Sequence, residues 1–161
     1  MIEPSIVDRA SLEPASLDKA VRALARASRL VERASIDLSF ADFRVMSALD
    51  AGEERATRLA DRLALGKPAV SASVDSLSKR GLIVRSKVEG DNRAVALTIS
   101  DDGRELYERM KARMARQLEL LAERTPDPQR VIDALALLED AVEAAILERY
   151  TRAAEQEAAA Q

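Results

Sequence analysis

Hydrophobic residues recur every three or four positions along most of the chain, and this spacing predicts a mainly helical protein. The first helix is predicted over residues 15–36, with Leu17, Val21 and Leu24 on one face and charged side chains on the other. Residues 1–14 carry no such pattern and are predicted to form a flexible arm. Further helices are predicted at about residues 39–52, 57–63, 68–80, 101–124 and 128–150. The tail, residues 151–161, either extends the last helix or frays.

After Gly81 the hydrophobic residues alternate instead of recurring at helical spacing. Residues 82–87 and 94–99 are therefore predicted to be strands, and Glu89-Gly90-Asp91-Asn92 between them has the composition of a hairpin turn. A helix, a tight turn, a second helix and a hairpin in this order are typical of a winged helix-turn-helix.

The predicted fold class is therefore mainly α with a small β-hairpin wing. The winged helix-turn-helix occupies residues 38–99, with a recognition helix at about 68–80 and a wing at about 83–98. The helices at 15–36 and 100–150 flank it and are predicted to be dimerisation helices, because a small winged domain has too little surface to cover their apolar faces. The alternative is that these helices form one intramolecular core.

Charge is distributed unevenly along the chain. The formal net charge is −3, which by itself argues against a nucleic-acid-binding protein. Residues 55–93, however, carry nine basic and four acidic side chains, whereas the rest of the chain carries sixteen basic and twenty-four acidic ones. Basic charge is thus concentrated in the segment predicted to meet DNA phosphates.

Composition narrows the chemistry further. The chain contains no cysteine and no histidine, which removes thiolate and imidazole metal ligands and the commonest general base. We therefore expect no enzymatic activity, no cofactor and no metal. No apolar run approaches the ~20 residues of a membrane helix, so we expect no membrane partner and a cytoplasmic location.

Several short motifs, taken in order, resemble the recognition helix and wing of the MarR-type (multiple antibiotic resistance) regulators. They are Leu-Gly-Lys-Pro-Ala-Val-Ser at 65–71, Val-Asp-Ser-Leu at 74–77, Arg-Gly-Leu-Ile-Val-Arg at 80–85, Asp-Asn-Arg at 91–93, and Leu-Thr at 97–98 followed by Gly103. The resemblance covers the central third of the chain. The wing of the family usually reads Asp-Arg-Arg, and here Asn92 stands in the middle.

The resemblance implies a homodimer that binds an inverted repeat in double-stranded operator DNA. It also implies that Arg93 enters the minor groove from the wing while Asp91 orients its guanidinium; alternatively, the two residues form an ordinary cross-turn pair. Most relatives are repressors whose DNA affinity is lowered by a small-molecule effector bound between the dimerisation helices and the winged domain. Arg22, Arg26 and Arg29 are candidates to meet an anionic effector, or they form a solvated face.

The candidate DNA-binding residues fall into three groups. Those on the recognition helix, whose small side chains allow close approach to base edges, are Lys67, Pro68, Ser71, Ser73 and Ser76. Basic residues expected to include the phosphate contacts are Arg55, Arg58, Lys79, Arg80, Arg85 and Lys87. The wing contributes Asp91, Asn92 and Arg93. The main alternative is a winged-helix module that binds protein and not DNA, whose affinity would lack a steep dependence on salt.

Overall fold

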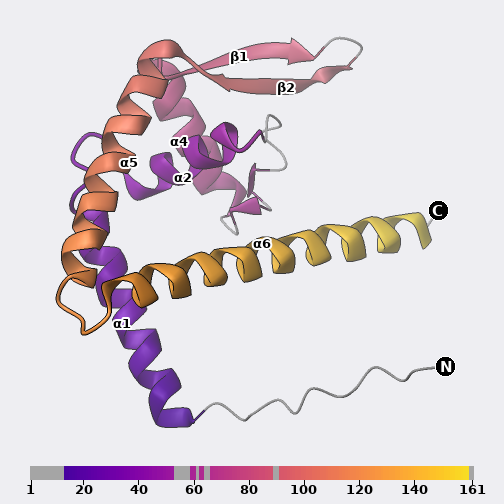
Figure 1. Ribbon diagram of the computed structural model, residues 1–161. Coiled ribbons are helices and arrows are strands. Elements are labelled where there is room, and N and C mark those ends of the chain that lie inside the picture. The colour runs from indigo at the N-terminus through magenta and orange to yellow at the C-terminus, as the bar shows by residue number, and fades with distance from the viewer. Residues whose placement is uncertain (1–12, 53–58, 61, 64–65, 89–90, 160–161) are drawn as a thin grey trace.

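The computed structural model describes residues 13–52, 59–60, 62–63, 66–88 and 91–159, and it has the predicted helical fold with a hairpin wing (Figure 1). The helices are α1 (Pro14–Glu32), α2 (Phe40–Asp50), α4 (Lys67–Lys79), α5 (Asp101–Ala122) and α6 (Pro128–Ala159). The strands are β1 (Ile83–Val88) and β2 (Asp91–Ile99), which form an antiparallel pair. Of the short helix predicted at 57–63, Leu59, Ala60 and Arg62 are helical, and Leu63 lies in a turn.

The hydrophobic core lies where α2, α4, the wing and the first half of α5 meet. Its fully buried side chains include Met46 from α2, Leu77 from α4, Leu97 from β2 and Met110 from α5. Helix α4 supplies a stripe at helical spacing, as predicted, and Gly81 at φ +71° ends it. The core therefore fixes α4 and the wing on the first half of α5.

The wing differs from its prediction at the turn. Val88 pairs with Asp91 and Lys87 with Val95, so only residues 89–90 separate the two strands and Asp91 and Asn92 belong to β2. The predicted four-residue turn was wrong because the register shifts between Lys87 and Val88, which places the extra residues inside β2.

One junction connects α4, the wing and α5. The Ser100 hydroxyl donates to the Gly81 carbonyl at 2.7 Å and accepts from the Gly103 amide at 3.1 Å, which caps α5. The Ser100 amide donates to the Leu82 carbonyl at 3.1 Å. A Cβ on Gly103 would lie 2.0 Å from that carbonyl oxygen, so the close approach requires glycine. The first turn of α5 thus contacts the end of α4 and the base of the wing directly.

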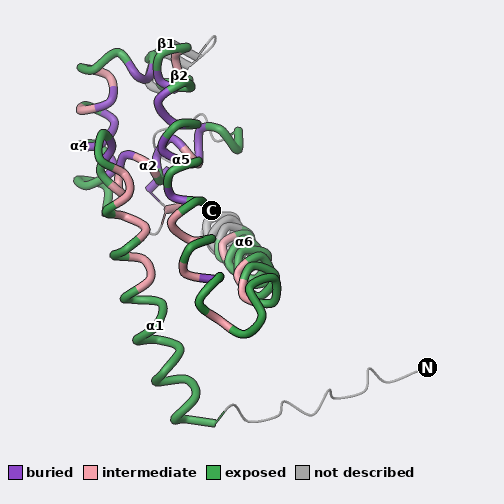
Figure 2. Tube along the Cα trace, turned by 60° about the vertical axis from the view of Figure 1, so that its left-hand side comes forward, coloured by how far each residue is buried: buried purple, intermediate pink, exposed green. Residues whose placement is uncertain are grey.

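Helices α1 and α6 are largely exposed in the single chain (Figure 2), and their exposed residues include large hydrophobic side chains. Within α1, all of which the structure describes, no residue is buried, and Val21 on the predicted apolar face is 66% exposed. Along α6, residues 128–149 and 151–152 include no buried residue either, and Leu137 is 70% exposed. The single chain therefore leaves these apolar faces uncovered, so the choice between dimerisation helices and one intramolecular core stays a prediction.

One helix boundary changes, and one of the two alternatives for the tail is confirmed. Helix α1 ends at Glu32, four residues before its predicted end, and the Ser35 hydroxyl donates to the Leu38 carbonyl at 2.8 Å in the connection to α2. Helix α6 continues through the tail to Ala159. In the part of the chain that the structure describes, no helix combines the length and the apolar character needed to cross a membrane.

Candidate nucleic-acid interface

Helix α4 presents an exposed face of small and charged side chains. Lys67, Pro68, Ser71 and Lys79 are exposed on this face, and Ser76 is half-buried at its edge. Ser73, which was predicted to contact the groove, is 6% exposed and lies beside the stripe of buried apolar side chains. That prediction was wrong because a small polar residue three positions after Val70 falls at the border between the two faces of the helix.

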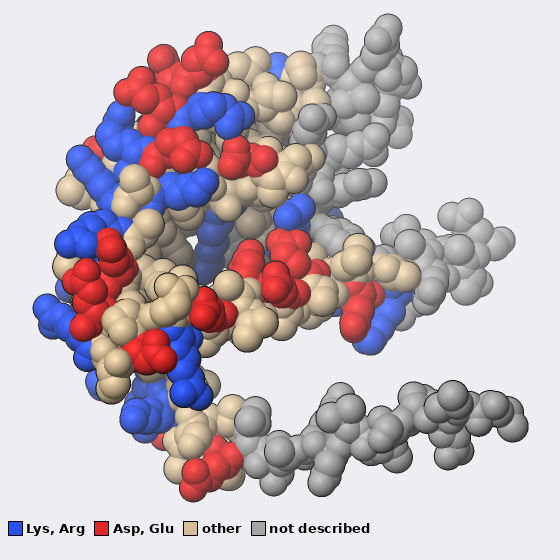
Figure 3. Space-filling model, in the orientation of Figure 1, with Lys and Arg blue, Asp and Glu red and all other residues tan. Residues whose placement is uncertain are grey.

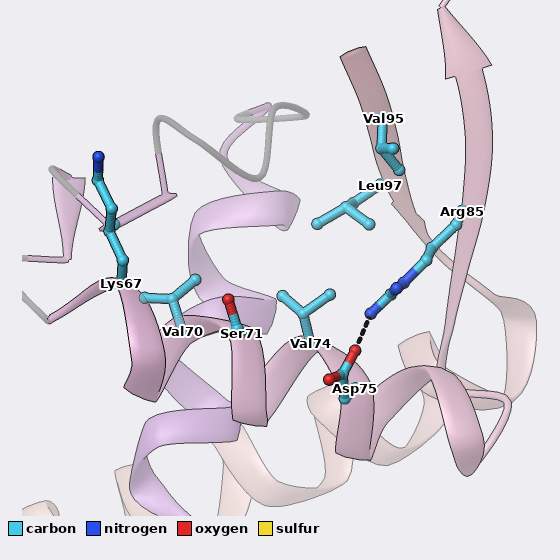
Figure 4. Close-up of a pocket in the computed structure, with 9 residues that line it drawn as sticks. Lys67, Val70, Ser71, Val74, Asp75, Arg85, Val95 and Leu97 are labelled. Atoms are coloured by element: carbon cyan, nitrogen blue, oxygen red, sulfur yellow. Dashed lines mark hydrogen bonds and ion pairs between the residues drawn. The ribbon is translucent and has the colours of Figure 1, made fainter. Parts of the chain in front are cut away.

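Arg85 lies on the inner face of the wing and reaches α4 (Figure 4). Successive side chains of a strand alternate between faces, so Arg85 shares the face of the buried Ile83. Its Nε donates to Ser78 Oγ at 3.1 Å, and its Nη2 forms an ion pair with Asp75 Oδ1. Arg85 was predicted as a phosphate contact, and its two side-chain partners, Asp75 and Ser78, were not predicted. The alternation of side chains along β1 was the sequence signal that places Arg85 on the inner face of the wing.

A cavity of about 370 Å³ separates α4 from the wing. Its buried apolar lining residues are Ala60, Val70, Val74 and Leu97, and Lys67 and Arg85 contribute positive charge. Figure 4 shows the Asp75–Arg85 ion pair on one side of this cavity. The face of α4 and the inner face of the wing therefore form one continuous, hollowed surface.

Two other basic residues of the winged domain contact neighbouring elements. Arg80 Nη2 donates to the Asp37 carbonyl at 2.7 Å, so this predicted phosphate contact also holds the segment before α2. Arg62 pairs with Glu143 of α6 at 3.1 Å. Figure 3 shows acidic side chains along α6, whereas acidic and basic side chains are intermixed around the first half of α5.

Part of the predicted site lies outside what the structure describes. Arg55 and Arg58 are outside the described residues altogether. For Lys87, Asp91, Asn92 and Arg93 the structure gives the backbone, in β1 and β2, but the side chains are outside the described part. Their predicted contacts with DNA stay predictions.

The three arginines proposed for an effector lie on α1. Arg22, Arg26 and Arg29 share one face at helical spacing, opposite the apolar stripe, and all three are exposed. Arg22 forms an ion pair with Asp18 one turn earlier. Arg26 and Arg29 extend the same face toward the C-terminal end of α1.

Comparisons with known proteins agree with this geometry. A MarR family model matches residues 36–94. A sequence comparison with curated proteins gives no match. Among solved structures, the transcriptional repressor CouR bound to a 23-mer DNA duplex is 27% identical with a TM-score of 0.67, and the match covers 83% of this chain and 99% of CouR.

Two further structures share the fold. The PcaV transcriptional regulator from Streptomyces coelicolor, in complex with its natural ligand, is 25% identical with a TM-score of 0.60, over 81% of this chain and 94% of PcaV. MarR from E. coli in its apo form is 18% identical with a TM-score of 0.65, over 81% of this chain and 97% of MarR. The MarR family model thus matches the winged helix-turn-helix, and along most of the chain the fold is similar to that of transcriptional regulators.

Proposed function

We propose that this protein is a homodimer that represses transcription by binding an inverted-repeat operator, and that a small-molecule effector releases it. Helix α4 enters the major groove, and the wing reaches the adjacent minor groove. The observation that carries the proposal is the exposed face of α4, whose small and basic side chains adjoin a hairpin wing. CouR, which shares the fold, was solved on a DNA duplex, and this supports the proposal.

The dimer is supported by the exposed apolar faces of α1 and α6. Large hydrophobic side chains along both helices contact water in the single chain, including Val21, Leu24, Leu137 and Leu147. Contiguous apolar surface of this kind marks an interaction site, and a second copy related by a two-fold axis covers the same face on both chains. Such a dimer reads two half-sites about one helical turn, ~34–36 Å, apart.

Val21→Asp tests the dimer, with Ala23→Asp as its matched control. Both variants place the same carboxylate on α1, one on the apolar stripe and one outside it. We expect Val21→Asp to be monomeric by sedimentation velocity and to lose operator binding, while Ala23→Asp stays dimeric. A wild-type protein that sediments as a monomer at micromolar concentration would refute the dimer.

DNA binding is tested by fluorescence anisotropy on duplexes from the protein's own upstream region. If the proposal is right, affinity falls steeply between roughly 50 and 200 mM salt, by about 10³- to 10⁵-fold for six to ten phosphate contacts. Arg93→Ala removes the proposed minor-groove contact and weakens binding further. Salt-independent binding that is equal for wild type and Arg93→Ala would overturn the assignment of the wing.

Release by an effector is supported by PcaV, which was solved with its natural ligand. A ligand shifts an equilibrium only by its different affinities for two states, so the effector must favour a spacing of the two recognition helices that does not fit DNA. Arg26 and Arg29 are the proposed contacts for an anionic group. A thermal-shift screen of small aromatic and lipophilic anions, followed by release from DNA, tests this. If no compound both stabilises the protein and releases DNA, the effector proposal fails.

A further inference from the structure

The ion pair between α4 and β1 lies within the surface proposed to meet DNA. Ser71, Asp75 and Lys79 follow one another at i, i+4 and i+8, so Asp75 occupies the middle of the exposed face of α4. Arg85 reaches it from the inner face of the wing. Both side chains remain accessible, at 58% exposure for Asp75 and 44% for Arg85. A ligand that contacts this face of α4 therefore meets the pair.

The contacts of Arg85 fix the orientation of its guanidinium. Nε is used by Ser78 and one N–H of Nη2 by Asp75, so one edge of the planar group lies against α4. Among the described residues, the remaining edge, formed by Nη1 and the second N–H of Nη2, has no hydrogen-bond partner. That edge is a fork of two parallel donors, the arrangement with which arginine binds two acceptors at once.

Charge argues against a phosphate-binding role for this arginine. The Asp75–Arg85 pair is neutral, so it releases few counterions from DNA, and its carboxylate repels nearby phosphates. An arginine whose guanidinium is fixed by two hydrogen-bond partners is instead suited to reading base edges, where the direction of the hydrogen bonds matters more than the net charge. Guanine offers O6 and N7 to such a fork, and an aspartate accepts from the N4 amino group of cytosine.

We propose that Asp75 and Arg85 together recognise a G·C base pair in each operator half-site, with Arg85 as the specificity-determining residue and Asp75 as the residue that positions it. The proposal rests on the DNA-binding function above and adds a feature of the operator sequence. Arg85 donates to guanine in the major groove beside α4, and the second carboxylate oxygen of Asp75 is placed to accept from cytosine.

The test compares base preferences at constant charge. Full-length wild type first selects operators from a pool of random duplexes, and its dissociation constants are then measured for all four base pairs at each position. We expect one symmetric position where wild type prefers G·C by about 5- to 150-fold. The double variant Asp75→Ala with Arg85→Ala, which leaves the net charge unchanged, should reduce that preference to within about twofold and leave other positions unaltered.

Two single variants separate the possible roles. Lys79→Ala removes one exposed charge from the same helix, so it should weaken binding to all sequences equally and reduce the salt dependence. Asp75→Asn frees Arg85 from its anchor, so it should tighten binding to every duplex while lowering the preference at the G·C position. A lower melting temperature with unchanged base preferences would assign the pair a structural role and overturn the proposal.

Failure of this inference differs from failure of the proposed function. If wild type selects no operator and shows no salt-dependent binding, DNA recognition itself fails. If wild type selects an operator and the double variant selects the same sequence with the same preferences, only the assignment of Asp75 and Arg85 to a base pair is overturned.

Discussion

Replacing Gly103 with alanine tests the junction between α5, α4 and the wing. The new Cβ would lie 2.0 Å from the carbonyl oxygen of Leu82 and 2.9 Å from its carbonyl carbon, whereas real Cβ contacts essentially never fall below 3.0 Å. The backbone at Leu82 must therefore move by about 1 Å. This movement weakens the hydrogen bond from the Ser100 amide to the same oxygen.

Opposing effects decide how far the free energy of unfolding falls in Gly103→Ala. Alanine gains about 1 kcal/mol over glycine through helix propensity. Overpacking costs about 1–3 kcal/mol, and a lost hydrogen bond in a partly buried site adds about 1–3 kcal/mol. We therefore expect the free energy of unfolding to fall by about 2–4 kcal/mol, which corresponds to a melting temperature lower by about 5–15 °C for a domain of this size.

The assay is thermal unfolding followed by circular dichroism at equal chain concentrations, because the proposed dimer would make the melting temperature depend on concentration. Gly66→Ala is the control: a Cβ there lies 3.7 Å from Pro68 Cδ, and the backbone is in an ordinary extended conformation. It should alter the free energy of unfolding by less than about 1 kcal/mol. A Gly103→Ala protein that melts at or above the wild-type temperature would refute the packing argument.

Four further substitutions are informative. Ser100→Ala removes the cap of α5 and the bond to Gly81, so urea unfolding should show a loss of about 1–2 kcal/mol; an unchanged midpoint would contradict this role. Leu77→Ala opens a cavity at a fully buried position and should cost about 2–5 kcal/mol in the same assay, with a smaller effect arguing that the core collapses around it. Ser73→Ala should leave the dissociation constant for operator DNA within about twofold of wild type, because the Ser73 side chain is buried. Ser71→Glu should weaken DNA binding by about tenfold or more, because the new carboxylate on the exposed face repels phosphates. If fluorescence anisotropy shows an equal loss of DNA affinity for these last two variants, Ser73 belongs to the DNA-binding surface after all.

Local patterns predicted the helices and the wing well. The stripe of Val70, Val74 and Leu77 between Pro68 and Gly81 combines period, start and stop signals, and the structure places α4 within one residue of its prediction. The end of α1 was predicted four residues late because Ser35 continues the helical spacing, while in the structure its hydroxyl bonds to Leu38. Periodicity records which positions suit a helix, and hydrogen bonds outside the helix decide where it ends.

The candidate site was less predictable than the fold. Asp75 and Arg85 stand ten positions apart on different elements, and their pairing depends on how the wing packs against α4. Arg85 was predicted to contact phosphates because a count of basic residues does not show which of them form ion pairs within the protein. The prediction for Ser73 was wrong for a related reason. A serine is small enough for either face of a helix, so its burial depends on how the helix packs in the folded chain.

The direct contact between the first turn of α5 and the base of the winged domain has a mechanical consequence. Helix α5 has 22 residues, so it is about 33 Å long and behaves as a stiff lever. If its far end is held in a dimer, a tilt of about 3° displaces the near end by about 2 Å. Since Ser100 and Gly103 tie that end to the backbone at Gly81 and Leu82, α4 and the wing travel with it as one body. A small change of angle far from DNA thereby becomes a change in the distance between two recognition helices.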